Sequence, residues 1–287
     1  MILSRRSLIG AGLVLTAAGL AGCSKAVRTA LTTTSTPSGP PVPTAQAPSS
    51  TAAGSSLPGT SPAQSASSPG PQSANASPGS TIPAPPSGPA VEIVNGPRDK
   101  PKVALTFHGA GDLGLARQLL KIANARGIHI TVMAVGTWLS DNPGIASEIL
   151  AGGHQIGNHT WSHQDINSMS EPGMQQEVIR CRDLLLQTVG APGAYFRPSQ
   201  APTANALMKQ VAGAAGYAIS LSYDVDSMDY TDPGAATVRQ NLAAAQPGSI
   251  VSMHLGHQDT IDALPGILDD LTARGLTAVT VGELLAG

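Results

Sequence analysis

The sequence is poor in cysteine, in aromatic residues and in charge. Only two cysteines occur among 287 residues, which excludes a scaffold stapled by several disulfides. Aromatic residues make up 3% and charged residues 12% of the chain, so part of it lacks the composition of an ordinary domain. A formal net charge of −2 provides neither a basic face for nucleic acid nor a polybasic patch for membrane lipids. No nucleic-acid partner is expected.

Residues 24–91 are predicted to be a disordered linker rich in Pro, Ser and Ala. Between Thr29 and Val91 the chain has no charged and no aromatic residue. Such a segment cannot bury enough apolar surface to offset its conformational entropy. All eight aromatic residues and all seven histidines lie beyond residue 100. The folded domain is therefore expected over residues 92–287.

Residues 1–23 have the pattern of an export signal. Arg5-Arg6 precedes a short apolar run, as in twin-arginine signals. The run spans about sixteen residues and is rich in Gly and Ala, which favours a cleaved signal over a signal anchor that stays in the bilayer. It ends in Leu20-Ala21-Gly22-Cys23, which resembles the bacterial lipobox. The resemblance implies a lipidated Cys23 that tethers the protein to the outer face of the cell membrane. Only this lipid anchor would contact the membrane.

Short apolar segments alternate with helical patterns beyond residue 100. Predicted strands cover 103–108, 129–135, 155–158, 195–197, 217–222, 249–253 and 276–281. Predicted helices cover 113–126, 145–150, 173–188, 203–215, 237–245 and 260–274. This alternation indicates an α/β fold with a parallel sheet, and about seven such units favour a (β/α)7-type barrel. Catalytic residues of such folds gather where the strands end.

Polar residues stand at the ends of several predicted strands, and the strongest motif is Asn158-His159-Thr160-Trp161-Ser162-His163. Two histidines four residues apart can share one face and bind a divalent ion. Taken alone, the pair is equally compatible with two ordinary polar histidines. It is accompanied by Arg197-Pro198, by Asp226 and by His254, each at the end of another predicted strand.

Taken in this order, the motifs resemble those of the polysaccharide deacetylases of carbohydrate esterase family 4, the NodB-type domain. The resemblance extends from Lys102 to Leu285. It implies a distorted (β/α) barrel that hydrolyses acetyl groups on nitrogen, with acetyl groups on oxygen as a second option. The implied substrate is a cell-wall or extracellular polysaccharide, either peptidoglycan or another N-acetylated glycan. The implied cofactor is a divalent metal, usually Zn²⁺, which polarises the acetyl carbonyl and activates water.

The resemblance also implies roles for individual residues. His159 and His163 match the metal ligands of the family. Arg197-Pro198-Ser199-Gln200 matches the start of the Arg-Pro-Pro-Tyr motif, so Arg197 would orient the base and the backbone N–H of Gln200 would stabilise the oxyanion.

Two further positions match the acid of the reaction and its partner. His254 would protonate the leaving amine, and Asp226, the first residue of Asp226-Ser227-Met228-Asp229-Tyr230, would keep that histidine charged. Ser252 stands where the family has a leucine that lines the pocket for the acetyl methyl group.

The first motif departs from the family. The family has Thr-Phe-Asp-Asp-Gly-Pro, where this chain has Thr106-Phe107-His108-Gly109-Ala110-Gly111-Asp112. Asp112 could swing in as the third ligand or could cap the following helix. His108 could instead be the third ligand, or the base, or a vestigial polar residue. A catalytically inactive barrel that binds cell-wall glycan is therefore the alternative function.

Overall fold

The structure is a computed structural model and describes residues 88–286. The predicted signal, the lipidation site Cys23 and the predicted linker up to residue 87 lie outside the described residues. The described chain contains no helix long and apolar enough to cross a membrane.

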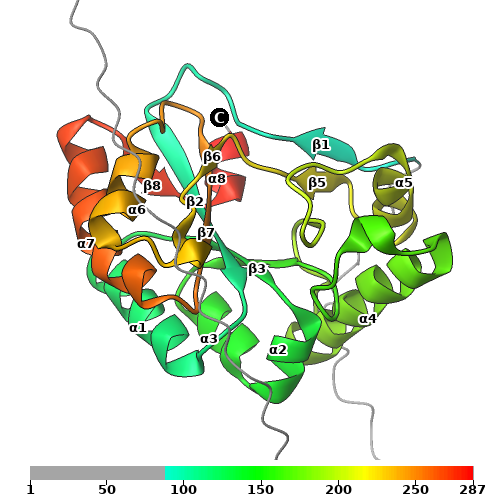
Figure 1. The fold of residues 1–287 in the computed structure, drawn as a ribbon. Helices are drawn as coiled ribbons and strands as arrows, with labels where there is room; N and C mark the ends of the chain where they lie inside the picture. Colours follow the sequence, from blue (N-terminus) through cyan, green and yellow to red (C-terminus); the bar gives the residue numbers. More distant parts are fainter. Residues whose placement is uncertain (1–87, 287) are drawn as a thin grey trace, which may run out of the picture. The chain divides into compact units, whose positions relative to one another are not determined.

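Parallel strands form the centre of the fold (Figure 1). The main sheet runs in the order β4 (Gln155–Asn158), β3 (Thr131–Ala134), β2 (Lys102–Gly109), β7 (Ile250–His254) and β6 (Val225–Asp226), and β8 (Thr277–Val279) also pairs with β2. A second pair joins β1 (Val91–Ile93) to β5 (Ile219–Leu221). Isolated bridges from Phe196 to Asn158 and to Ser220 link β4 to β5, so the strands follow the course of a distorted barrel.

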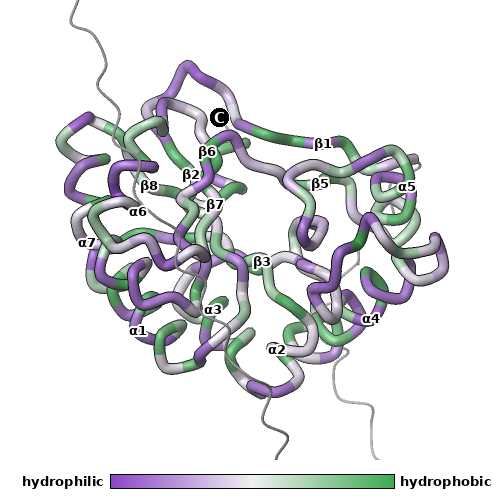
Figure 2. Tube along the Cα trace, viewed as in Figure 1, coloured by the Kyte–Doolittle hydropathy of each residue, from purple (hydrophilic) through white to green (hydrophobic). Residues whose placement is uncertain are grey.

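Helices cover the outside of the strands in Figure 1. They are α1 (Leu113–Ala125), α2 (Gly136–Asp141), α3 (Ile145–Ala151), α4 (Glu171–Val189), α5 (Ala206–Ala214), α6 (Ala235–Leu242), α7 (Gln258–Ala273) and α8 (Val281–Leu285). Two 3₁₀ turns, η1 (Ile166–Ser168) and η2 (Asp229–Thr231), lie in the connections. Green and purple alternate along the outer helices in Figure 2, as expected for helices with one apolar face. This arrangement confirms the α/β fold class.

The core forms where the apolar faces of the helices meet the strands. Helix α1 buries Ala116, Leu119, Leu120 and Ala123, at the spacing that places side chains on one face of a helix. These residues belong to the same apolar cluster as Leu105 and Phe107 of β2, which are fully buried. Strand β2 pairs with β3, β7 and β8 and is therefore the most central strand of the sheet.

The structure differs from the sequence-based expectations at short elements. Val91, expected in the linker, pairs with Ile219 of β5, and Ala90 is buried, so the fold begins before residue 92. The expected strand 195–197 is reduced to bridges at Phe196. Strand β6 has two residues and was not predicted, because so short a segment shows no periodicity.

Truncation of a core side chain tests this packing. Leu119→Ala is expected to lower the free energy of unfolding by about 2–5 kcal/mol, because it removes buried apolar contacts and leaves a cavity. Leu150→Ala on α3 is the matched control, since Leu150 is 39% exposed, and it should cost less than about 1 kcal/mol. Urea denaturation measures both values. Equal losses in the two variants would contradict the packing of α1.

Candidate functional site

The parallel register brings the ends of the central strands together. His108 near the end of β2 is the ladder partner of His254 at the end of β7. Gly109 of β2 pairs with Ala134 of β3, which pairs in turn with Asn158 of β4. The polar residues that follow these strands therefore meet at one edge of the sheet, as the sequence predicts.

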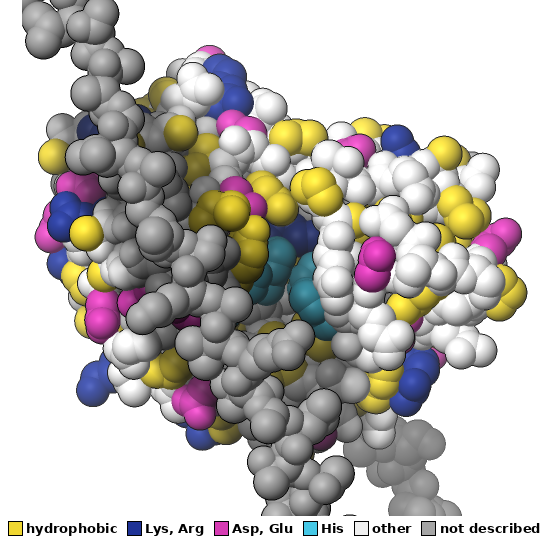
Figure 3. Space-filling model, viewed as in Figure 1, with side chains coloured by type: hydrophobic (Ala, Val, Ile, Leu, Met, Phe, Trp, Pro, Cys, Tyr) yellow, Lys and Arg dark blue, Asp and Glu magenta, His cyan; other side chains and the backbone are white. Residues whose placement is uncertain are grey.

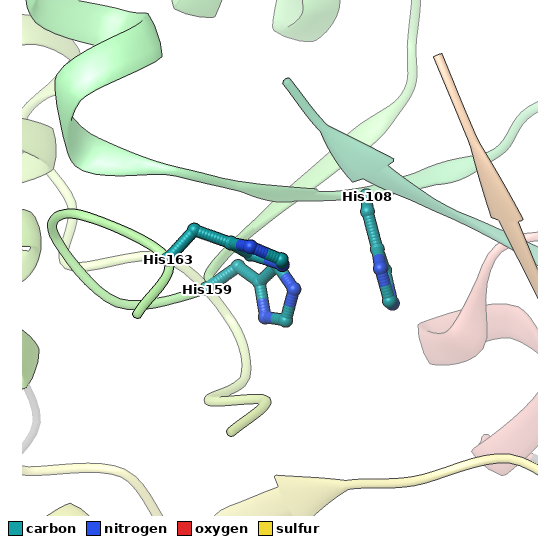
Figure 4. A group of neighbouring side chains, drawn as sticks. All are labelled: His108, His159 and His163. Atoms are coloured by element: carbon teal, nitrogen blue, oxygen red, sulfur yellow. The ribbon is translucent and has the colours of Figure 1, made fainter. Parts of the chain in front are cut away.

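Three histidines from this edge form a candidate metal centre (Figure 4). One ring nitrogen from each of His108, His159 and His163 lies within 4.8 Å of the other two. The ring centroids of His108 and His159 are 4.3 Å apart, and those of His159 and His163 are 4.8 Å apart. Three imidazoles are a known donor set for Zn²⁺ in catalytic sites that keep one coordination position open.

The hydrogen bonding of His159 leaves one ring nitrogen free for a metal. Its Nδ1 lies 3.0 Å from the carbonyl oxygen of Arg197, so Nδ1–H donates and Nε2 keeps its lone pair. Nε2 of His159 and Nδ1 of His108 are buried and have no hydrogen-bond partner within residues 88–286. Unpartnered buried ring nitrogens in a cluster of histidines fit a bound cation, which would satisfy them.

Burial keeps these imidazoles neutral. It lowers the pKa of His108 and of His159 well below the usual value, and neighbouring histidines lower both further. The hydrogen bond to the Arg197 carbonyl raises the pKa of His159 in part, without reversing the shift. Burial also lowers the pKa of His163. Metal binding requires the neutral ring, so the electrostatics suit the donor set.

Glu177 of α4 holds the loop that carries His159 and His163. Its carboxylate accepts hydrogen bonds from Trp161 N at 3.0 Å, from Ser162 N at 2.7 Å and from the Ser162 hydroxyl at 2.8 Å. His163 has a left-handed backbone with φ 57°, a strained conformation that such contacts stabilise. No local pattern pointed to Glu177, because it lies 15 residues from Ser162 along the chain.

Asp112 does not belong to the cluster, which corrects the expectation that it is a metal ligand. Its carboxylate accepts the backbone N–H of Leu115 at 2.8 Å and caps α1. Other contacts hold the loop that precedes Asp112. Trp138 Nε1 donates a hydrogen bond to the Gly111 carbonyl at 3.0 Å. Gly111 also packs closely on Gly256, since a Cβ on Gly111 would lie 2.8 Å from Gly256 Cα. Asp112 thus takes the N-cap alternative in this structure, and His108 is the residue that lies with His159 and His163.

The position next to His108 is crowded for a second carboxylate. A Cβ built on Gly109 would lie 2.9 Å from a methyl carbon of Val132, 3.0 Å from Ala134 Cα and 3.3 Å from the Trp138 ring. Contacts this short require the neighbours to move. Glycine at 109 is therefore matched to the packing of β2 against β3.

The partner of His254 is Asp229, which corrects the expectation for Asp226. His254 Nδ1 lies 2.7 Å from Asp229 Oδ1, and the backbone N–H of His254 donates to Oδ2 at 2.8 Å. Burial alone raises the pKa of the Asp229 carboxyl, but hydrogen bonds from His254 and from Thr260 lower it below its usual range. Asp226 instead accepts the backbone N–H of Met228 at 2.9 Å.

Arg197 is a buried cation without a carboxylate partner in the described part of the chain. Its guanidinium donates to the Leu221 carbonyl at 3.0 Å and to the Thr106 hydroxyl at 2.9 Å. Nη1 is buried and unpartnered among residues 88–286. Burial lowers the pKa of Arg197 to about 10. Arg197 therefore lies beside the cluster as expected, but it contacts no acidic base.

A cleft of about 630 Å³ opens above the cluster. Its lining includes His108, His163, Gln200, Asp226, Tyr230, Ser252, His254 and His257. Figure 3 shows histidine side chains (cyan) in this hollow, beside hydrophobic side chains (yellow). Gln200 has φ 52° and donates from its amide to the His163 carbonyl at 2.8 Å. The oxyanion role of its backbone N–H stays a prediction.

Ser252 lines the cleft with a polar hydroxyl next to His108. It is 1% exposed, and its hydroxyl is 3.5 Å from His108 Nε2. The ring of His108 thus has a polar neighbour at the position where the family resemblance implies a leucine.

Several known proteins that are similar to this chain are named as deacetylases. The family model described as polysaccharide deacetylase matches residues 95–220. A peptidoglycan-N-acetylglucosamine deacetylase of Bacillus cereus is 30% identical over 196 residues, covering 66% of this chain and 70% of the relative. The corresponding enzyme PgdA of Listeria monocytogenes is 28% identical over 200 residues, 69% of this chain. The chain spans 42% of the length of PgdA.

Solved structures have the same fold. The Bc1960 peptidoglycan N-acetylglucosamine deacetylase superposes with a TM-score of 0.64 at 28% identity, covering 68% of this chain and 92% of that one. BA3943 of Bacillus anthracis, described as a pseudoenzyme of carbohydrate esterase family 4, gives 0.64 at 21% identity, covering 68% of each chain. The second similarity shows the fold alone. The NodB-type barrel expected from the motifs is confirmed.

Substitutions at 108 and 112 distinguish the two candidate third ligands. His108→Ala is expected to weaken Zn²⁺ binding by more than about 100-fold, because it removes one of three donors. Asp112→Ala should leave the affinity unchanged and lower the free energy of unfolding by about 1 kcal/mol through loss of the N-cap. Metal titration with a competing chelator and urea denaturation measure the two effects. Weaker metal binding in Asp112→Ala would instead assign its carboxylate to the metal.

The lowered histidine pKa values predict acid sensitivity of the metal-free protein. Between the folded-state pKa and about 6.5 the unfolded chain binds more protons than the folded chain. The free energy of unfolding should therefore fall as the pH drops below about 6.5, by up to about 1.4 kcal/mol per pH unit for each buried histidine. Urea denaturation in the presence of chelator measures this slope. The slope should be shallower in His108→Leu, and an unchanged slope would contradict the burial argument.

Proposed function

The chain belongs to the polysaccharide deacetylase family, and we propose that it removes N-acetyl groups from a cell-wall glycan with a divalent metal held by His108, His159 and His163. The observation that carries this proposal is the arrangement in the cleft. Three imidazoles lie on one side, with His159 buried and His108 and His163 partly buried, and the His254–Asp229 pair lies beside them. The names of the relatives support peptidoglycan or another polymer of N-acetylated sugars as the substrate class.

The metal supplies Lewis acidity toward the acetamide carbonyl and makes water more acidic, and Zn²⁺ is the ion that a three-histidine donor set favours. The chain orients the donors. The Arg197 carbonyl fixes His159 with Nε2 free, and Glu177 holds the loop of His163. His108 takes the third position, which the family fills with a carboxylate. If His108 were the base instead, only His159 and His163 of this cluster would remain as metal ligands.

His254 is proposed to act on the leaving group. Asp229 accepts the Nδ1–H of His254, so Nε2 is the ring nitrogen that can exchange a proton in the cleft. His254 Nε2 accepts a proton from the water whose oxygen bonds to the acetyl carbonyl carbon. The protonated ring then donates that Nε2–H to the sugar nitrogen as the carbon–nitrogen bond breaks and acetate leaves. The buried Asp229 carboxylate stabilises the positive charge that the ring carries between these two transfers.

Location completes the proposal. The twin-arginine signal over residues 1–23 and the lipidated Cys23 would place the domain outside the cell membrane. The linker would extend it toward the wall polymer. An inactive module that binds wall glycan is the second candidate, and the observation that favours it is the replacement of the acidic pair by His108-Gly109.

Asparagine substitutions at 229 and 226 test the acid. Asp229→Asn is expected to lower acetate release from N-acetylglucosamine oligomers by about 10²–10⁴-fold, because it removes the charge that stabilises protonated His254. Zn²⁺ content should stay unchanged, since Asp229 is not among the donors. Asp226→Asn is the matched control and should lower the rate by a smaller factor.

The same assay separates the two candidate functions. Stoichiometric Zn²⁺ together with acetate release that is lost in His159→Ala would support the enzyme. Metal-free protein that sediments with cell-wall polysaccharide and releases no acetate with added Zn²⁺ would support the binding module.

A further inference from the structure

The cleft contains a second histidine–aspartate pair next to the first. His257 Nδ1 lies 2.8 Å from Asp232 Oδ1, and in both pairs the histidine follows the aspartate by 25 residues. The two histidine rings are 5.7 Å apart. The chemistry proposed above uses His254 and leaves His257 without a role.

The backbone is built to present both carboxylates. Asp229 and Asp232 are three residues apart across η2, and the flanking residues Met228 and Asp232 have φ values of 55° and 49°. Left-handed backbone at residues other than glycine costs energy and needs support from its surroundings. The first turn of α7 provides that support, because Asp259 accepts the Gly234 N–H at 2.6 Å and the Thr260 hydroxyl donates to Asp229 at 2.5 Å.

The second pair lies on the solvent side of the first. The side chain of His257 is 27% exposed and that of Asp232 is 67% exposed, whereas Asp229 is fully buried. His257 and Tyr230 both line the cleft, and Tyr230 is 46% exposed. An exposed aromatic ring near an oriented imidazole suits a sugar, whose apolar face stacks on the ring while its polar groups form hydrogen bonds.

We propose that His257, oriented by Asp232, binds the sugar residue next to the one that loses its acetyl group. With Nδ1–H donated to the Asp232 carboxylate, Nε2 accepts a hydrogen bond from a hydroxyl or an amide N–H of that neighbouring sugar. The site therefore selects a chain of at least two sugars over a single one. This inference rests on the proposed function only in that the cleft receives an N-acetylated glycan.

Binding measurements on the metal-free full chain test this role without depending on catalysis. His257→Phe and Asp232→Asn are expected to weaken binding of a tetramer of N-acetylglucosamine by about tenfold, equivalent to about 1.4 kcal/mol, measured by calorimetry. Binding of the monosaccharide, followed by ligand-observed NMR, should stay unchanged. His129→Phe is the matched control, because its ring contacts Glu283 and His154 and does not line this cleft.

The outcomes separate this inference from the proposed function. If His257→Phe and Asp232→Asn bind the tetramer as tightly as the wild type does, the proposed role of His257 is overturned. The proposed function is unaffected by that result. A wild type that binds no oligosaccharide overturns both. A merely structural role would weaken tetramer and monosaccharide binding alike and lower the unfolding temperature. His257→Gln, which keeps a polar side chain, is expected to bind the tetramer with intermediate affinity, and a loss as large as in His257→Phe would count against a hydrogen bond.

Discussion

The ladder between β2 and β7 is the constraint on which the site depends. It places His108, one proposed metal donor, beside the proposed acid His254. On the other side of β2 the sheet continues through β3 to β4, and β4 leads into the loop that carries His159 and His163. Because strand pairing in the interior tolerates little displacement, these groups keep fixed distances without a ligand. Strand register thus positions His108 and His254, whereas the loop held by Glu177 positions His159 and His163.

The exchange of two carboxylates for His108-Gly109 changes the charge of the site as well as its donors. A neutral imidazole stands where the family resemblance implies a carboxylate, and the buried Arg197 has no carboxylate partner among the described residues. Asp229 is a buried carboxylate of this site, but it already accepts hydrogen bonds from His254 and Thr260. The described site therefore carries more positive potential than a set with two aspartates, and such a potential favours neutral imidazoles and anionic or polar ligands near Arg197.

The long periodic elements could be predicted from the sequence, and so could the histidines at the strand ends. Strand β4 and the start of α1 were predicted at their observed bounds, because apolar periodicity and an N-cap aspartate mark them locally. The choice between Asp226 and Asp229 could not be predicted, since both lie near the end of β6 and only the η2 turn decides which one meets His254. Glu177 and the fixed Gly111 loop depend on contacts distant in sequence.

The packing around Gly109 has a consequence for engineering the site. A carboxylate side chain at position 109 would meet a methyl group of Val132, Cα of Ala134 and the ring of Trp138. Because Ala134 contributes a backbone atom of β3, such a substitution needs a small shift of that strand as well as of two side chains. A redesigned carboxylate donor would therefore require compensating changes on β3 and α2.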